Sequence, residues 1–170
     1  KGADSLILVA QQLKKLGVEF KFFICGDGNL KGLIQKQIQD NQLSESVTML
    51  GALDFKSQLI PFTKENIDLF VCCHLQGDPS CTYLETMSCG VPIVGYANEA
   101  FAGVVKYAQA GWLVPMNRPD RLAQKIYELD KNREEIVSES YKSLAFSRLH
   151  TFEKTFEKRI EHLKQIVLQP

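Results

Sequence analysis

Residues 69–95 restrict the possible fold more than any other part of the sequence. An apolar run at 69–73 is typical of a buried strand. The residues after it can begin a helix, with Asp78 as the expected cap and Pro79 in the first turn. Gly90 and Pro92 end this helix, and a second apolar run follows. A strand, a loop, a helix and a strand in this order predict parallel strands joined by a crossover.

The same alternation runs along the whole chain. Helical periodicity is predicted over 3–16, 30–38, 56–66, 101–108, 119–129, 132–146 and 152–167, and short apolar or β-rich runs lie at 20–25, 47–50, 69–73, 92–95 and 112–114. This pattern predicts an α/β fold with a doubly wound (Rossmann-like) parallel sheet and helices on both faces. The long C-terminal helix mixes Glu and Lys on its polar sides, so its apolar stripe is expected to pack on its own or a neighbouring domain, not on a membrane.

The composition excludes several classes of protein. The 170 residues fit one domain, and 20 basic side chains balance 20 acidic ones, so no net charge would attract nucleic acid. No apolar run approaches the roughly 20 residues of a membrane span. The five cysteines are odd in number and include no C-x-x-C pair, which argues against a disulfide framework or a zinc site and favours a reducing cytoplasm.

The helix that follows residues 69–73 is expected to begin at the carboxyl edge of the parallel sheet. Its free amides and the positive end of its dipole make that position suitable for a phosphate. Glu85, further along the helix, can accept hydrogen bonds from neighbouring hydroxyls such as those of a ribose. Gly26-Asp27-Gly28 is a second candidate phosphate contact, although its spacing is not that of a dinucleotide fingerprint. These residues predict a domain for a phosphorylated ligand.

Several motifs in one order resemble a known family. They lie at 1–10, 26–28, 47–51, 68–71, 84–94 and 110–115. Together they are similar to the C-terminal, donor-binding domain of the family 4 (group 1) retaining glycosyltransferases, which have the GT-B fold. The resemblance covers nearly the whole chain and implies that residues 1–170 are a single Rossmann-like domain, the C-terminal half of a GT-B architecture.

The resemblance implies roles for individual residues. Glu85 would bind the ribose hydroxyls of a nucleotide-sugar donor, and the backbone amides of Cys81 and Thr82 would bind its diphosphate. Lys1 would bind phosphate and, together with Glu85, support the leaving nucleoside diphosphate. The loop around Leu53 would border the base. No residue is assigned a catalytic role beyond this support of the leaving group.

Other positions complete the expected donor site. Gly77 lies eight residues before Glu85, where the family usually has a glutamate that contacts the donor sugar, so Asp78 or Gln76 is expected to replace it. Pro79-Ser80 stands where the family has a Phe-Gly pair. The full set of expected substrate-binding residues is Lys1, Gly26, Gly28, Leu53, Gly77, Asp78, Ser80, Cys81, Thr82 and Glu85. No metal ligand is expected, and no cofactor besides the nucleotide-diphosphate sugar that serves as donor substrate.

The implied function is transfer of a hexose from that donor to a glycan or lipid-linked acceptor, with retention and without metal, in polysaccharide biosynthesis. The domain's first strand and an N-terminal acceptor domain are expected upstream of Lys1, so these residues alone should be inactive. Expected partners are the nucleotide sugar and the acceptor, without nucleic acid or a membrane span. The expected location is the cytoplasm, with a peripheral position at the inner face of the membrane through the acceptor domain.

Two alternatives remain open at this point. A sugar-nucleotide epimerase of similar fold would need an acid or base near the donor sugar, and His74, at the end of the strand at 69–73, is the candidate. A nucleotide-binding module without catalysis is the other alternative, because Gly77 replaces the glutamate that the family usually has.

Overall fold

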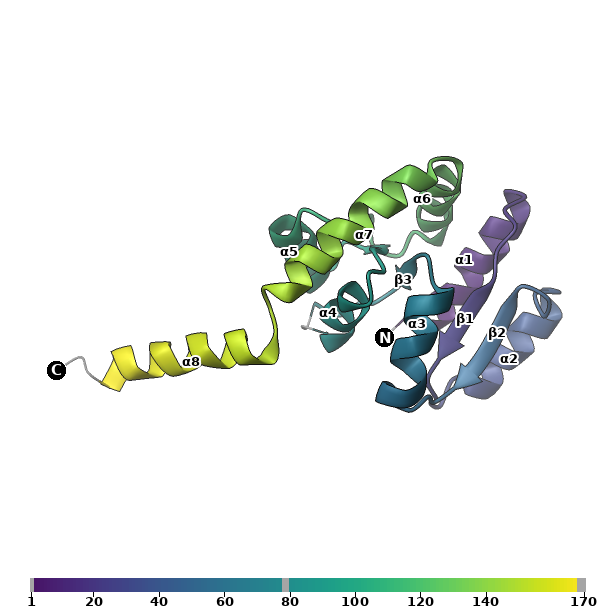
Figure 1. The fold of residues 1–170 in the computed structure, drawn as a ribbon. Helices are drawn as coiled ribbons and strands as arrows, with labels where there is room; N and C mark the ends of the chain where they lie inside the picture. The colour runs from purple at the N-terminus through teal and green to yellow at the C-terminus, as the bar shows by residue number, and fades with distance from the viewer. Residues whose placement is uncertain (1, 78–79, 168–170) are drawn as a thin grey trace.

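The structure, a computed structural model, describes residues 2–77 and 80–167 and has the predicted alternation of helices and short strands (Figure 1). Its elements in chain order are α1 (Ala3–Lys15), β1 (Phe22–Cys25), α2 (Lys31–Asp40), β2 (Val47–Gly51), the π-helical turn η1 (Phe55–Leu59), α3 (Ile60–Asn66), β3 (Phe70–Cys72), α4 (Cys81–Ser88), β4 (Ile93–Tyr96), α5 (Glu99–Ala108), β5 (Trp112–Val114), α6 (Pro119–Lys131), α7 (Arg133–Arg148) and α8 (Phe152–Val167).

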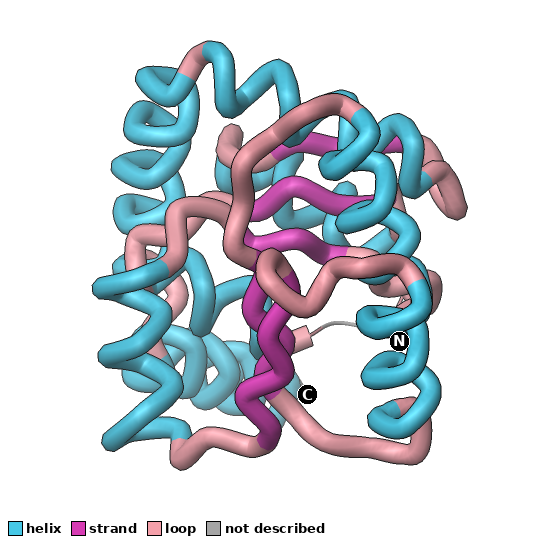
Figure 2. Tube along the Cα trace, turned by 90° about the vertical axis from the view of Figure 1, so that its right-hand side faces the viewer, coloured by secondary structure: helices cyan, strands magenta, loops and turns pink. Residues whose placement is uncertain are grey.

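The strands are parallel, as predicted, but they form two sheets. β1 pairs with β2, while β3, β4 and β5 pair in that order. Figure 2 shows the two groups of strands, drawn in magenta, as separate parts of the chain trace. β1 and β3 are edge strands, and residues of both line one cavity of about 840 Å³. The cavity therefore lies where a continuous doubly wound sheet would have another strand.

Apolar side chains surround most of this cavity. They come from α1, β1, α3 and β3 and include Leu6, Leu13, Phe22, Ile24, Phe62, Phe70 and Val71. One side of α4 closes the cavity with more polar residues. The cavity therefore adjoins α4, the helix on which the donor site is predicted from the sequence.

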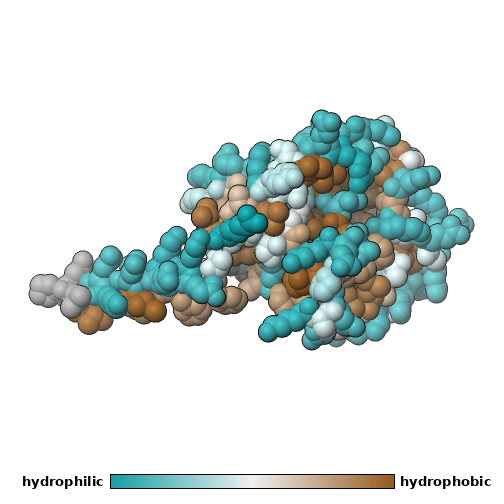
Figure 3. Space-filling view, in the orientation of Figure 1, coloured by the Kyte–Doolittle hydropathy of each residue, from teal (hydrophilic) through white to brown (hydrophobic). Residues whose placement is uncertain are grey.

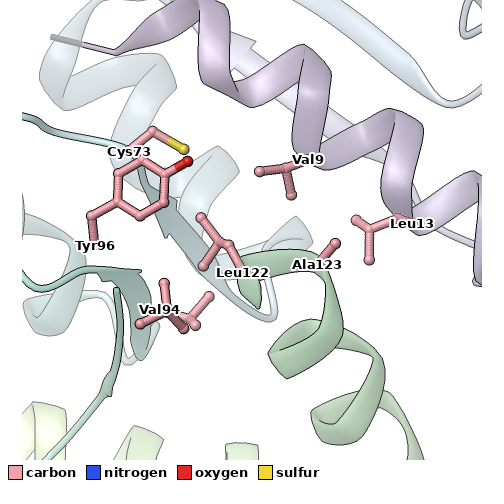
Figure 4. Packing of buried hydrophobic residues seen from close by; sticks show 8 residues of the cluster. Val9, Leu13, Cys73, Val94, Tyr96, Leu122 and Ala123 are labelled. Atoms are coloured by element: carbon pink, nitrogen blue, oxygen red, sulfur yellow. The ribbon is translucent and has the colours of Figure 1, made fainter. Parts of the chain in front are cut away.

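The main core joins α1 and α6 to β4. Val9 and Leu13 lie four residues apart on α1, so they share one helical face, and both are buried. They pack with Leu122 and Ala123 of α6 and with side chains from the strands (Figure 4). Full burial of a Val or Leu side chain stabilises a fold by about 1.5–3 kcal/mol, so this contact holds α1 and α6 firmly together.

The helix predicted over 56–66 is divided into two parts. Residues Phe55–Leu59 form η1, and the α-helical part begins at Ile60. Pro61 therefore lies in the first turn of α3, where the missing amide hydrogen of proline costs no helical hydrogen bond. Asp54 caps the π-helical turn, since its Oδ1 accepts hydrogen bonds from the Ser57 amide at 2.8 Å and the Ser57 hydroxyl at 2.5 Å.

The C-terminal helix α8 extends away from the rest of the chain (Figure 1). None of its residues is buried, and Phe156, Ile160 and Leu163 are 49–60% exposed. Figure 3 shows apolar residues gathered along one side of this helix. The expected amphipathic helix is present, but it does not pack on its own domain. Within the described residues, no helix combines the length and the apolar character needed to cross a membrane.

Candidate functional site

α4 is the next element after β3, so the chain reaches the N-terminus of α4 from the carboxyl end of a parallel strand. Ser80 is the N-cap residue, with extended backbone angles of φ −118° and ψ 126°, and its side chain makes no capping hydrogen bond. The Tyr83 amide donates to the Ser80 carbonyl at 3.2 Å, whereas the amides of Cys81 and Thr82 receive no acceptor from the Ser80 side chain and can donate to a ligand. Asp78, the cap expected from the sequence, lies outside the described residues, as does Lys1.

One face of α4 lines the cavity. Thr82, Glu85, Thr86 and Cys89 follow each other at helical spacing and all contribute to its wall. Glu85 is half-buried, while Cys81 at the start of the helix is exposed. Tyr83 and Met87, on the other side, are buried against β4 and α5. The structure thus places Thr82 and Glu85, two of the predicted donor-binding residues, on the same side of the helix and one turn apart.

A buried polar cluster fixes α4 relative to the loops around it. The Tyr83 hydroxyl lies 3.3 Å from His74 Nδ1 and accepts a hydrogen bond of 3.3 Å from Asn98 Nδ2. Asn98 Nδ2 also donates to the carbonyl oxygen of His74 at 3.1 Å. These contacts connect the loop after β3, the helix α4 and the loop after β4. His74 is therefore part of a structural network beside the site as well as part of the cavity wall.

The backbone amides of Gly26 and Gly28 both donate hydrogen bonds to other groups of the protein. The Gly26 amide donates to the carbonyl of Gly51 at 2.7 Å, and the Gly28 amide donates to Asp27 Oδ1 at 2.7 Å. Lys31 forms a 2.9 Å salt bridge with the other carboxylate oxygen, and its hydrogen bond is the main reason that the pKa of Asp27 is lowered. Both glycine amides are engaged within the protein, and neither glycine lines the cavity. A phosphate contact here stays a prediction.

The remaining predicted residues are dispersed around the site. Leu53 does not line the cavity, but Phe55 and Leu59 of the adjoining η1 do. Gly77 precedes α4, and an added Cβ on it would lie 3.2 Å from the Cβ of Glu99.

Glu99 and its neighbour Asn98 were not predicted from the sequence as residues of the site. An Asn followed by a Glu before an apolar periodic stretch is a helix-start signal that could have revealed both.

The cysteines are all free thiols. Burial raises the pKa of Cys25, Cys72 and Cys89, and it raises the pKa of Cys73 to about 12. These four thiols are therefore protonated at neutral pH and poorly nucleophilic. In the described part of the chain, no group of three or more His, Cys, Asp or Glu side chains could hold a metal ion.

A parallel α/β domain with a helix N-terminus at the carboxyl edge of its sheet is typical of proteins that bind phosphorylated ligands. Comparison with known families identifies which class this is. Residues 1–144 match the sequence model of the family described as glycosyl transferases group 1. The chain belongs to this family, and its fold is that of the C-terminal domain of a GT-B glycosyltransferase.

Individual relatives agree with this assignment. A putative colanic acid biosynthesis glycosyltransferase of Salmonella typhimurium, WcaL, is 28% identical over 138 residues, which are 77% of this chain and 33% of the relative. A glycosyltransferase structure from Rickettsia africae superimposes with a TM-score of 0.84 at 15% identity, over 100% of this chain and 46% of that one. The chain therefore spans less than half the length of these proteins.

A further solved structure was determined with a nucleotide sugar. The Anabaena protein HepE in complex with UDP-glucose has a TM-score of 0.76 and 20% sequence identity to this chain, over 97% of this chain and 45% of that one. At this identity the likeness concerns the fold.

Proposed function

We propose that this domain binds the donor of a hexosyltransferase that moves a hexose from a nucleotide-diphosphate sugar to a glycan or lipid-linked acceptor. The family supplies the reaction class, glycosyl transfer. The names of two similar proteins support the finer statement: one is assigned to colanic acid biosynthesis, and another was crystallised with UDP-glucose. Polysaccharide biosynthesis is accordingly the proposed process.

The observation that carries the proposal is the first turn of α4. The Ser80 side chain does not cap this turn, and Thr82 and Glu85 share the side that faces the cavity. In the proposed complex the amides of Cys81 and Thr82 bind the diphosphate, and Glu85 accepts hydrogen bonds from the ribose hydroxyls. Lys1 adds a positive charge at the phosphates, and the loop at Leu53 borders the base.

A substitution of Glu85 tests this assignment. Hydrogen bonds to a charged group contribute about 1.5–3 kcal/mol, so Glu85→Ala should weaken nucleoside diphosphate binding by roughly 10- to 150-fold in calorimetry. Glu157→Ala, on the exposed helix α8, is the matched control and should leave binding unchanged. Equal affinities of the wild-type protein and Glu85→Ala would remove Glu85 from the donor site.

The proposed mechanism is retaining and independent of metal. The dipole of α4 and its free amides stabilise the negative charge that develops on the leaving diphosphate. Full activity of the whole enzyme in excess chelator would support metal independence, and restoration of lost activity by Mg²⁺ would oppose it. The anomeric configuration of the new glycosidic bond, determined by NMR and compared with that of the donor, distinguishes retention from inversion.

We also propose that a β-strand upstream of Lys1 fills the cavity between β1 and β3. Both are edge strands along this cavity, and Gly2 lies in its wall. Neighbouring strands are about 4.8 Å apart, so one strand between β1 and β3 would pair with both and join the two sheets. Running into α1, it would be parallel to β1 and would form a β-α-β unit with it.

Hydrogen exchange can test this strand. In the natural chain extended upstream of Lys1, the amides of β1 and β3 should be protected much more strongly than in the 170-residue chain, because the inserted strand accepts their hydrogen bonds. The amides of β5, whose neighbour is β4, serve as internal controls. Unchanged exchange at β1 and β3 in the extended chain would contradict the proposal.

The acceptor domain is proposed to lie in the further length that the relatives have, and α8 is the element proposed to contact it. Its exposed apolar side includes Phe156, Ile160 and Leu163. The proposed peripheral location at the cytoplasmic face of the membrane would depend on that domain, and fractionation of cells expressing the whole protein would test it.

A further inference from the structure

Gly77 and Glu99 share one small space at the edge of the proposed donor site. A Cβ on Gly77 would lie 3.2 Å from the Cβ of Glu99 and 3.4 Å from its Oε2 atom. Gly77 does not have the positive φ that would itself require glycine. The reason for a glycine here is therefore spatial: the side chain of Glu99 occupies the volume that a side chain at position 77 would fill.

The position of Glu99 is fixed by the residue before it. Asn98 is 3% exposed, and its Oδ1 accepts a hydrogen bond of 2.9 Å from the Phe101 amide, which caps α5. Its Nδ2 group bonds the carbonyl oxygen of His74 and the hydroxyl of Tyr83. The first turn of α5 is thereby attached to the loop after β3 and to α4. Glu99 thus belongs to the same rigid frame as Thr82 and Glu85.

The carboxylate of Glu99 has the properties of a ligand-binding group. The residue is exposed, and among residues 2–77 and 80–167 its carboxylate has no hydrogen-bond or salt-bridge partner. An acid in the first turn of a helix also interacts favourably with the helix dipole. That effect alone does not explain why the side chain lies against Gly77, on the segment that leads into the N-terminus of α4.

We infer that Glu99 binds hydroxyl groups of the donor's sugar, as the carboxylate that the first turn of α5 supplies in place of a side chain at position 77. An ionised carboxylate only accepts hydrogen bonds, and the hydroxyls of a hexose are the donors that suit it. It would repel a phosphate, so its partner is the sugar and not the diphosphate. This inference rests on the proposed donor site at α4.

The test separates binding of the sugar from binding of the nucleotide. A panel of UDP-glucose, UDP-N-acetylglucosamine and GDP-mannose first identifies the nucleotide sugar that the wild-type whole enzyme binds. Glu99→Gln should lower the affinity for this nucleotide sugar by about 10-fold or more. Binding of the corresponding nucleoside diphosphate should stay within about twofold of wild type. Glu134→Gln changes another exposed first-turn glutamate, on α7, and should alter neither affinity.

A second variant tests the shared space. Gly77→Ala keeps the charge of Glu99 but places a methyl group against its side chain, so it should cause the same selective loss of sugar affinity. Equal losses for the sugar and the diphosphate, or no loss in Glu99→Gln, would overturn the inference while leaving the donor site intact. A wild-type enzyme that binds neither the diphosphates nor their sugars would overturn the donor site and this inference with it.

Discussion

The side chain of Asn98 donates a hydrogen bond of 3.1 Å to the backbone carbonyl of His74, which joins the loop after β4 to the loop after β3. Asn98→Ala would remove this bond, the bond to the Tyr83 hydroxyl and the cap of α5 together. Loss of a cap costs about 1 kcal/mol, and an unsatisfied buried carbonyl about 1–3 kcal/mol. We therefore expect a loss of about 2–4 kcal/mol in the free energy of unfolding, measured by urea denaturation.

A serine at the same position separates the cap from the bonds of the side-chain amide. Asn98→Ser retains an oxygen that can cap α5, but it has no amide group to donate to the carbonyl of His74 and the hydroxyl of Tyr83. Its stability should lie between those of the wild type and Asn98→Ala. If the serine variant is as stable as the wild type, the bond between the two loops contributes nothing and only the cap matters.

Glu139 has a similar connecting role between α7 and the residue before β5. It is 8% exposed; its Oε2 accepts a 2.8 Å hydrogen bond from the Gly111 amide, and its Oε1 accepts one of 2.5 Å from Lys142. Glu139→Ala should destabilise the protein by about 2–3 kcal/mol, because the amide before β5 would lose its acceptor. Glu134→Ala, an exposed position of the same helix, should stay within about 0.5 kcal/mol of the wild type in the same denaturation experiment.

Local patterns made α4 predictable, because each feature depends on residues close in sequence. The helical spacing from Thr82 to Glu85 and the stop signal at Gly90 are properties of one short segment. Pro61 is another local signal. It lies within the helix predicted over 56–66, and the structure has a π-helical turn that ends before the proline and an α-helix that begins next to it.

Contacts between distant segments could not be read from the sequence. Gly77 and Glu99 meet because β3 and β4 pair side by side and their following loops emerge at the same edge. The open space between β1 and β3 likewise depends on strand order and not on any local pattern. The sequence therefore indicates which helix holds the proposed nucleotide half of the site, whereas the proposed sugar half follows from tertiary structure.

Alkaline pH should destabilise the fold through two buried acids. Burial raises the pKa of Cys73 from 9.0 to about 12 and the pKa of Tyr96 from 10.0 to about 12. Above pH 9 the unfolded chain loses these protons before the folded protein does. Stability should consequently fall as the pH rises from 9 towards 12, by at most about 1.4 kcal/mol per pH unit for each group.

Cys73→Ala would identify the contribution of the thiol. This variant should show a flatter decrease of unfolding free energy above pH 9 than the wild type in urea denaturation at stepped pH values. Val137→Ala, at an exposed position without an ionisable group, should keep the wild-type slope. Parallel curves for Cys73→Ala and the wild type would show that Cys73 does not titrate in this range.

Two glycines should respond to alanine in opposite directions. Gly2 has a φ of 74°, and a Cβ there would lie 2.0 Å from the carbonyl oxygen of Cys73, a backbone atom that cannot move aside easily. Gly2→Ala should therefore lower the free energy of unfolding by about 3 kcal/mol or more, from strain and overpacking combined.

Gly32, inside α2, has no atom within 4 Å of its ideal Cβ position. Gly32→Ala should raise stability by about 0.5–1 kcal/mol, since alanine favours the helix and restricts the unfolded chain. Equal effects of the two substitutions in thermal or urea denaturation would contradict the close approach of Gly2 to the end of β3.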